Sequence, residues 1–377
     1  YKDGWVDLAD GAGFSLTMVN PASADLNLWD EKAGWRSSLA AGGTPGGVDT
    51  VLAAGSIVMN ELLAHSHGTA SDWIELYNTT GQNINIGGWF LSDRNNDNTN
   101  IMKYEIPAGT VINAGSYLVF VESMTFGNPS AQGCNIPFGL SEAGETVYLQ
   151  SGEAGLLTGY YQTEENFDAS ETGVTFGRYE KAELSGGYDF TRMISPTPGG
   201  ANSGPLIADI VITEIHYNPP SGGAYEFVEL YNRSDSPVVL MSEASTETSP
   251  GVFVTETIPW RLKGTEFEFP ANMTIPAHTR ILVARTPSLY SSSPCEVYGP
   301  YSGALDNSGE EIEIQIPGDQ EYGKSRYWIP IEKVDYDDVA PWPTSADGGG
   351  HSLHRINANS YGRDCSNWNA AALTPGS

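Results

Sequence analysis

The sequence predicts an all-β protein in which one type of domain occurs more than once. Its 377 residues include 43 Gly, 23 Pro, 19 Tyr and 9 Trp, a composition typical of many short strands joined by turns. Stretches with the periodicity of an amphipathic helix are almost absent. A series of strand patterns also returns later in the chain, at a period too long for a short-unit solenoid. We therefore expect tandem β-domains with very little helix.

The repeat covers most of the chain. In its first copy, IVMNE at 57–61 is followed by DWIELYN at 72–78, GWFL at 88–91, PAGTVI at 107–112 and LSEAGETV at 140–147. In its second copy, the corresponding segments are IVITE at 210–214, EFVELYN at 226–232, WRL at 260–262, PANMTI at 270–275 and LDNSGEEI at 305–312. Each copy ends at its own Thr-Pro-Gly, which begins at Thr197 and at Thr374. The repeat predicts complete domains at residues 51–204 and 205–377, separated by a linker rich in Gly and Pro.

Residues 1–50 resemble the last third of one more copy. DGAGFSL at 10–16, Trp35 and TPG at 44–46 match DGGGHSL at 347–353, Trp368 and TPG at 374–376. A segment with so few strands cannot bury an apolar face by itself. We expect it to dock on another part of the protein or to add to the edge of a sheet.

Within the copies, alternating residues indicate strands with one apolar face. Residues 73–77 and 116–121 alternate in this way, as expected for strands half covered by a second sheet. The second copy carries a longer insert between Asn232 and Trp260 and another before Asp335. Inserts of this kind lie in surface loops, where binding residues are usually found.

Charge excludes some classes of partner. Eighteen Lys and Arg against 47 Asp and Glu give a formal charge of −29, which repels phosphate backbones and anionic lipid surfaces. We expect no nucleic acid partner, and no apolar run is long enough to insert into a membrane. Cys295 and Cys365 could pair in an oxidising compartment, or both could remain reduced.

The combined pattern of NE at 60–61, WIELYN at 73–78, GWFLSD at 88–93, IPAGTVI at 106–112 and PTPGGAN at 196–202 resembles the lamin tail domain. The resemblance implies immunoglobulin-like β-sandwiches in tandem, as found in secreted or surface proteins of bacteria. It implies a spacer or adhesion module with no catalytic residues of its own. No basic cluster or heptad repeat accompanies it, so a filament or chromatin role does not follow.

Carboxylates on the first two strands of each copy are the most suggestive titratable groups: Glu61 and Glu75, then Glu214 and Glu229. Two neighbouring carboxylates can share a cation or act as an acid and a base. The alternative, which we favour, is that they satisfy backbone donors or lie on the polar face of a sheet. His65 and His67 could bind a transition metal, but an exposed loop pair explains them better.

The best metal candidate has oxygen-bearing side chains at alternate positions: Asp93, Asn95, Asp97 and Thr99. Calcium prefers such oxygen ligands, and calcium is the only cofactor we expect. The glycine and glutamate that an EF-hand loop requires are replaced by Asn98 and Tyr104. A plain Asn- and Asp-rich loop is the alternative.

Three aromatic residues of the second copy fall outside the repeated pattern: Tyr327, Trp328 and Trp342. The tryptophans at repeated strand positions are explained as core. We expect these three to form an exposed contact for a carbohydrate or a protein.

These observations predict a non-enzymatic segment of a larger extracellular or cell-surface bacterial protein. It would act as a spacer or adhesion module between neighbouring domains, or bind a surface protein or polysaccharide. The alternative is a carbohydrate-binding module appended to a secreted enzyme. An enzyme would instead require a pocket with converging carboxylates or histidines.

Overall fold

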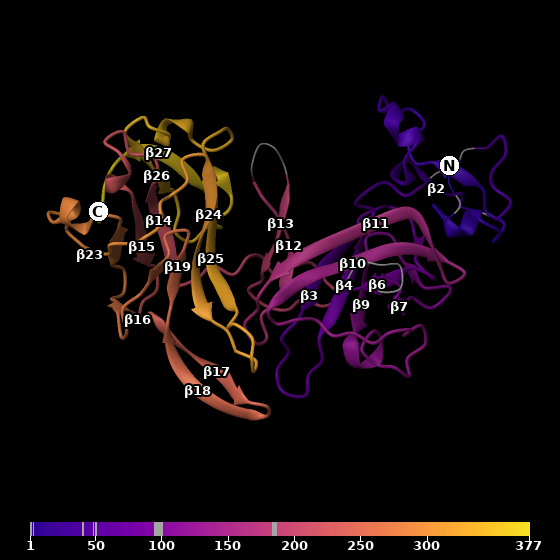
Figure 1. The fold of residues 1–377 in the computed structure, drawn as a ribbon, viewed down its shortest axis with the longest axis horizontal. Coiled ribbons are helices and arrows are strands. Elements are labelled where there is room, and N and C mark those ends of the chain that lie inside the picture. The colour runs from indigo at the N-terminus through magenta and orange to yellow at the C-terminus, as the bar shows by residue number, and fades with distance from the viewer. Residues whose placement is uncertain are drawn as a thin grey trace. The chain divides into compact units, whose positions relative to one another are not determined.

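The computed structural model describes residues 2, 4–39, 41–47, 49, 51–93, 101–182 and 187–377. In these residues the fold is all-β, and the helical segments are short 3₁₀ turns (Figure 1). The prediction of an all-β chain is therefore confirmed. Within the described residues, no helix is long and apolar enough to cross a lipid bilayer.

The chain divides into two compact units. Unit 1 comprises Tyr1–Arg178 and Phe190–Gly204, and unit 2 comprises Tyr179–Asp189 and Pro205–Ser377. The main change of unit, between Gly204 and Pro205, falls at the Gly- and Pro-rich linker. Residues 1–50 belong to unit 1.

The two larger sheets of unit 1 enclose one core. One sheet has five strands in the order β13-β12-β3-β4-β9, and the other has four in the order β11-β10-β6-β7. The elements are β3 (Ile57–Leu63), β4 (Trp73–Asn78), β5 (Ile84–Asn85), β6 (Phe90–Ser92), β7 (Tyr104–Glu105), β8 (Val111–Ile112), β9 (Tyr117–Val121), η4 (Glu122–Met124), β10 (Gly144–Glu153), β11 (Leu156–Asp168), β12 (Phe176–Glu180) and β13 (Tyr188–Arg192). The end of β12 and the start of β13 fall within residues 179–189, which count with unit 2. Trp89, Leu76 and Phe176 are among the residues buried between them. The repeated aromatic positions fill the core, as a sandwich requires.

Unit 2 repeats this arrangement with additions. Its sheets have the orders β23-β22-β15-β14-β26-β27 and β20-β19-β24-β25. The elements are β14 (Ile210–His216), η5 (Gly223–Tyr225), β15 (Phe227–Asn232), β16 (Val238–Val239), β17 (Met241–Ser249), β18 (Val252–Pro259), β19 (Arg261–Lys263), β20 (Phe267–Glu268), β21 (Thr274–Ile275), β22 (Arg280–Ala284), η6 (Pro287–Tyr290), β23 (Glu296–Tyr298), β24 (Gly309–Pro317), β25 (Trp328–Asp337), η7 (Thr344–Ala346), β26 (His351–Arg355), η8 (Cys365–Asn367) and β27 (Trp368–Ala372). The long Ser-, Thr- and Glu-rich insert forms the hairpin β17–β18.

The N-terminal segment forms a hairpin of its own, preceded by a 3₁₀ turn. Its elements are η1 (Asp7–Ala9), β1 (Leu16–Met18), η2 (Leu26–Trp29), η3 (Lys32–Gly34) and β2 (Trp35–Ser37). The segment docks on β11, where the Ser37 hydroxyl donates a hydrogen bond to the Thr158 carbonyl oxygen at 3.1 Å. The docking that the sequence suggests is therefore present within unit 1.

The hairpin β1–β2 has the same register as the last hairpin of unit 2. Leu16 pairs with Ser37 and Met18 with Trp35. At the matching positions, Leu353 pairs with Ala370 and Arg355 with Trp368. The sequence match between the two segments thus extends to strand pairing.

Candidate functional site

The acidic pair of each copy lies at the centre of its larger sheet. Glu61 on β3 stands directly opposite Glu75 on β4, and Glu214 on β14 stands opposite Glu229 on β15. A β-bulge precedes the first glutamate of each pair, at Asn60 and at Thr213. The four side chains are at most 2% exposed. Buried carboxylates are costly unless hydrogen bonds compensate them.

In the first copy, the donors come mainly from the closing loop, which is Thr197-Pro198-Gly199. The Thr197 N–H and hydroxyl donate to Glu61 Oε2 at 3.0 and 2.7 Å. The Gly199 N–H donates to Glu75 Oε2. The loop that ends the copy is therefore fastened to the strands that begin it.

Two side chains next to the pair complete the set of donors in the first copy. The Thr175 hydroxyl donates to Glu61 Oε1 at 2.6 Å. The Asn60 side-chain amide donates to Glu75 Oε1 at 2.7 Å. Burial raises the pKa of Glu75, and the charge of Glu61 raises it further. The hydrogen bonds from Gly199 and Asn60 lower this pKa but do not cancel the effect of burial.

The second copy repeats this set of hydrogen bonds almost donor for donor. The closing loop Thr374-Pro375-Gly376 supplies the Thr374 N–H to Glu214 Oε1 at 3.2 Å and the Gly376 N–H to Glu229 Oε2 at 2.8 Å. The hydroxyl of Ser352, which occupies the position of Thr175, donates to Glu214 Oε1 at 2.5 Å. The hydroxyl of Thr213 donates to Glu229 Oε1 at 2.6 Å. Burial raises the pKa of both Glu214 and Glu229.

The second copy also brings a serine and a histidine to its acidic pair. The Ser352 hydroxyl lies 2.9 Å from His354 Nε2, and His354 Nε2 lies 3.4 Å from Glu214 Oε1. In a nucleophilic triad the histidine bridges the serine and the acid, but here Ser352 also bonds directly to the carboxylate. Ser352 is 1% exposed. The arrangement of Ser352, His354 and Glu214 therefore differs from that of a nucleophilic triad.

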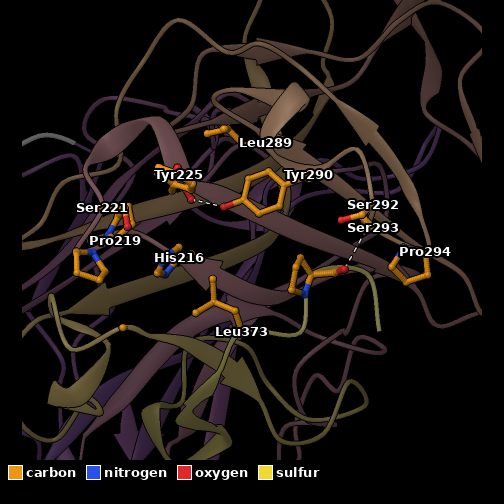
Figure 2. Close-up of a pocket in the computed structure, with 13 residues that line it drawn as sticks. His216, Pro219, Ser221, Tyr225, Leu289, Tyr290, Ser292, Ser293, Pro294 and Leu373 are labelled. Carbon is orange, nitrogen blue, oxygen red and sulfur yellow. Dashed lines mark hydrogen bonds between the residues drawn. The ribbon is translucent and has the colours of Figure 1, made fainter.

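A separate cavity of about 520 Å³ opens in unit 2 (Figure 2). Its lining consists of proline, serine, tyrosine and leucine side chains around one histidine: His216, Pro219, Pro220, Ser221, Tyr225, Leu289, Tyr290, Ser292, Ser293, Pro294, Gly350, Leu373 and Pro375. In Figure 2, Pro219 and Ser221 lie on one side of the cavity and Pro294 lies on the other, with Tyr290 and Leu373 between them. The Tyr290 hydroxyl donates to the Tyr225 carbonyl oxygen at 2.5 Å.

His216 is the histidine in the lining of this cavity. It is 3% exposed, and burial lowers its pKa to about 4, so the ring is neutral at pH 7. Its Nδ1 atom is buried, and no hydrogen bond reaches it from the described residues. A neutral imidazole with a bare nitrogen accepts a hydrogen bond from a hydroxyl or an amide. No sequence pattern singles out this residue, because His216 lies at an ordinary position of a strand.

The proposed calcium ligands are described only in part. Asn95, Asp97 and Thr99 lie outside the described residues. Asp93 is described, and its carboxylate forms an ion pair with the Lys103 ammonium group. Elsewhere in the described chain, no three His, Cys, Asp or Glu side chains gather in a metal-binding group. His65 instead contacts Glu142 at 3.2 Å and the Ser170 carbonyl oxygen at 3.2 Å.

The three aromatic candidates do not form an exposed patch. Trp342 is 8% exposed and packs in the core at 6.0 Å from Trp368, so the expectation of an exposed ring there is wrong. The loop that carries Trp342 turns onto the core of unit 2, so that the ring faces inward although its position lies outside the repeat. Trp328 begins β25, is only partly exposed, and lies beneath the Arg261 guanidinium at 4.1 Å. Tyr327, next to it, is also half-buried.

The cysteines form no disulfide in the part of the chain that the structure describes. Cys365 is buried in the core of unit 2, and Cys295 lies beside Ser293 with their side-chain atoms 3.4 Å apart. Of the two alternatives for Cys295 and Cys365, the structure contains the one with no disulfide between them.

The two-sheet sandwich and the acidic pair define an immunoglobulin-like domain whose last loop is bound to its first strands. Residues 50–164 match the family model of the Lamin Tail Domain, so the first copy carries a lamin tail domain. No curated protein matches the chain. A crystal structure of a DUF4876 family protein from Bacteroides thetaiotaomicron VPI-5482 is 10% identical and aligns over 84% of this chain and 92% of that one, with a TM-score of 0.24. A score this low supports no argument about the fold.

Proposed function

We propose that this chain is a non-catalytic structural and adhesion segment of a larger extracellular or cell-surface bacterial protein. The proposal rests on the hydrogen bonds between the acidic pairs and the closing loops. In both copies these buried carboxylates, which are the groups best suited to acid and base chemistry, accept hydrogen bonds from the closing loop. Their role is to hold a domain shut, which suits a spacer between neighbouring domains.

The extracellular and bacterial parts of the proposal follow from the resemblance to secreted lamin tail proteins. The formal charge of −29 agrees with a partner that is neither nucleic acid nor an anionic membrane. Within unit 2, the cavity lined by Tyr225 and Tyr290 is the proposed contact for a surface protein or polysaccharide.

Carbohydrate binding is the second candidate, and one specific observation favours it. The cavity combines the rings of Tyr225 and Tyr290, which suit stacking on the apolar face of a sugar, with the side chains of Ser221 and Ser292, which suit hydrogen bonding to sugar hydroxyls. This site replaces the aromatic patch around Trp342 that the sequence suggested.

A glycan array probed with the labelled full chain separates the two candidates. Binding that is lost in Tyr225→Ala and kept in the control variant Tyr148→Ala, which changes a half-buried tyrosine on β10 of unit 1, would make the segment a carbohydrate-binding module. Absence of glycan binding, with adhesion to a surface protein, would support the first candidate. Turnover of ester, glycoside or phosphate substrates that Glu229→Gln abolishes would overturn both.

Calcium remains a proposed cofactor of the first copy. A cation that binds only the folded state raises the melting temperature. We expect unit 1 to melt higher in millimolar calcium than in EDTA, and we expect Asp93→Ala with Asp97→Ala to remove the difference. An equal melting temperature in both solutions would refute the proposal.

A further inference from the structure

The N-terminal hairpin carries a closing loop that has no acidic pair to hold. Its Thr44-Pro45-Gly46 occupies the position of Thr197-Pro198-Gly199 in the first copy and of Thr374-Pro375-Gly376 in the second. Across the described residues, no hydrogen bond uses the Thr44 or Gly46 N–H group as donor. In both complete copies the corresponding N–H groups bind buried glutamates.

The hydroxyl donor of the acidic pair is also present. Ser15 occupies the position of Thr175 and Ser352, whose hydroxyls donate to Glu61 and Glu214. Ser15 and Thr44 line one open cavity of about 620 Å³ beside the hairpin. The segment therefore contains the donors of the closure, and among the described residues no strand accepts from them.

The backbone of β1 is open on the side where those strands would pair. The Ser38 N–H donates to the Ser15 carbonyl oxygen, and the Val19 N–H donates to the Gly34 carbonyl oxygen. In this antiparallel register Ser15, Thr17 and Val19 bond toward β2, so the N–H and C=O groups of Leu16 and Met18 point away from it. No other described strand pairs with β1.

The complete copies show what pairs with this edge. At the position of β1, strand β12 pairs with β3 so that Phe176 is opposite Leu62 and Gly177 is opposite Glu61. In the second copy β26 pairs with β14, with Leu353 opposite Ile215 and His354 opposite Glu214. The same register on β1 would place an apolar residue opposite Leu16 and a glutamate opposite Thr17.

We propose that the β1 edge and the Thr44-Pro45-Gly46 loop form a docking site for a β-strand pair from outside the described chain, which presents two facing glutamates in the manner of β3 and β4. The incoming first strand adds to β1 by backbone hydrogen bonding. Its glutamate accepts from Ser15 and Thr44, and the glutamate of its second strand accepts from the Gly46 N–H. Charge-assisted hydrogen bonds then supply the specificity.

The probe is a fluorescein-labelled peptide of residues 56–79, which contains β3, β4 and their connection, titrated with the full chain by fluorescence anisotropy. We expect saturable binding. A peptide with Glu61→Gln and Glu75→Gln should bind about tenfold more weakly, since each glutamate loses charge-assisted hydrogen bonds. A scrambled peptide of the same composition controls for non-specific β-association. Equal affinity of the two strand-pair peptides, or no binding at millimolar concentration, would overturn the proposal.

Variants of the chain locate the site. Thr44→Pro removes both the N–H and the hydroxyl donor and should weaken peptide binding by about tenfold. Thr44→Val removes only the hydroxyl and keeps the test valid if the proline variant misfolds. Thr374→Val, at the matched position in unit 2, should leave the affinity unchanged. An affinity that responds equally to the Thr44 and Thr374 variants would contradict the assignment.

Residue-resolved amide exchange provides an independent readout. Bound peptide should slow the exchange of the Leu16 and Met18 amides and leave the Thr17 amide, which already bonds β2, unchanged. Protection that falls on β17–β18 instead would overturn the proposal. Protection of Leu16 and Met18 that rises with chain concentration in the absence of peptide would identify a second copy as the occupant and refute the strand pair.

Discussion

The two complete copies hold their acidic pairs by the same neutral donors but differ in charged partners. In the second copy, Arg280 lies 3.0 Å from Glu229 and His354 lies 3.4 Å from Glu214. Among the described residues of the first copy, no Lys, Arg or His forms an ion pair with Glu61 or Glu75. Hydroxyl, side-chain amide and backbone N–H donors are therefore sufficient to bury the pair, and the cations of the second copy are an addition.

The largest expected effect is the loss of the first glutamate in each copy. Glu61→Ala and Glu214→Ala each leave several buried donors without an acceptor, which should cost about 3 to 5 kcal/mol of unfolding free energy in the affected unit. Chemical denaturation followed by fluorescence measures it. Glu153→Ala, at an exposed end of β10, is the control. A cost below about 1 kcal/mol would mean that the closing loop is held by other contacts.

The two copies also differ two residues beyond the first glutamate of each pair, where the second copy has His216 and the first has Leu63. The folded-state pKa of His216 is lowered to about 4 from an ordinary value of 6.5. The stability that depends on the neutral ring is therefore complete above pH 6.5 and is lost as the pH falls toward 4, by up to about 3 kcal/mol.

His216→Leu makes the second copy like the first at this position and should remove that part of the pH dependence. Unfolding free energies of the wild type and the variant, measured from pH 7.5 to 4.5, test it. The carboxylates Glu214 and Glu229, whose pKa values are raised, act in the opposite direction and are the same in both proteins. Parallel pH profiles for the two proteins would contradict the prediction.

The threonine hydroxyls of the two closing loops should differ in their contribution. Thr197 Oγ1 lies 2.7 Å from Glu61 Oε2, whereas Thr374 Oγ1 lies 3.2 Å from Glu214 Oε2. Thr197→Val should cost about 1 to 2 kcal/mol, as expected for a hydrogen bond to a charged group, and Thr374→Val should cost less. Thermal unfolding of the two variants side by side gives the order, and the reverse order would show that these distances do not rank the two bonds.

The smallest effect is expected from the extra cation of the second copy. Arg280 is partly exposed and also lies over the Tyr231 ring at 4.7 Å. The first copy has Tyr117 at this position, stacked on Tyr77 at 4.5 Å. Arg280→Tyr should therefore change stability by less than about 1 kcal/mol, because a partly exposed ion pair is screened and a ring stack replaces it. A larger loss would make the cation essential to the second acidic pair.

Sequence reasoning reached the fold because the repeat placed the same residues at the same strand positions twice. It located the acidic pairs and favoured a structural role for them, and the closing Thr-Pro-Gly was visible as a repeated boundary. The sequence does not show that the closing Thr-Pro-Gly binds the acidic pair. Thr197 is 136 residues from Glu61 in the chain, and no local pattern predicts that contact.

The proposed binding surface is harder to predict from the sequence. Trp342 was expected to be exposed because it lies outside the repeat, but burial depends on where a loop turns, and here it turns onto the core. The cavity around His216 combines residues from β14, η6 and the chain beyond β27, which lie far apart in the sequence. Such a site depends on tertiary packing, and composition carries little signal for it.

The closing loops also bear on how the chain is made. Thr197 and Thr374 come at the end of their copies, so each domain binds its first strands only after its last residues have left the ribosome or an export channel. Until then the paired glutamates lack the donors of the closing loop, although β12 and β26, which pair with β3 and β14, come earlier in the chain. Each copy therefore remains an unfinished domain for most of its synthesis, and a protease that removed only the Thr-Pro-Gly would return a mature domain to that state.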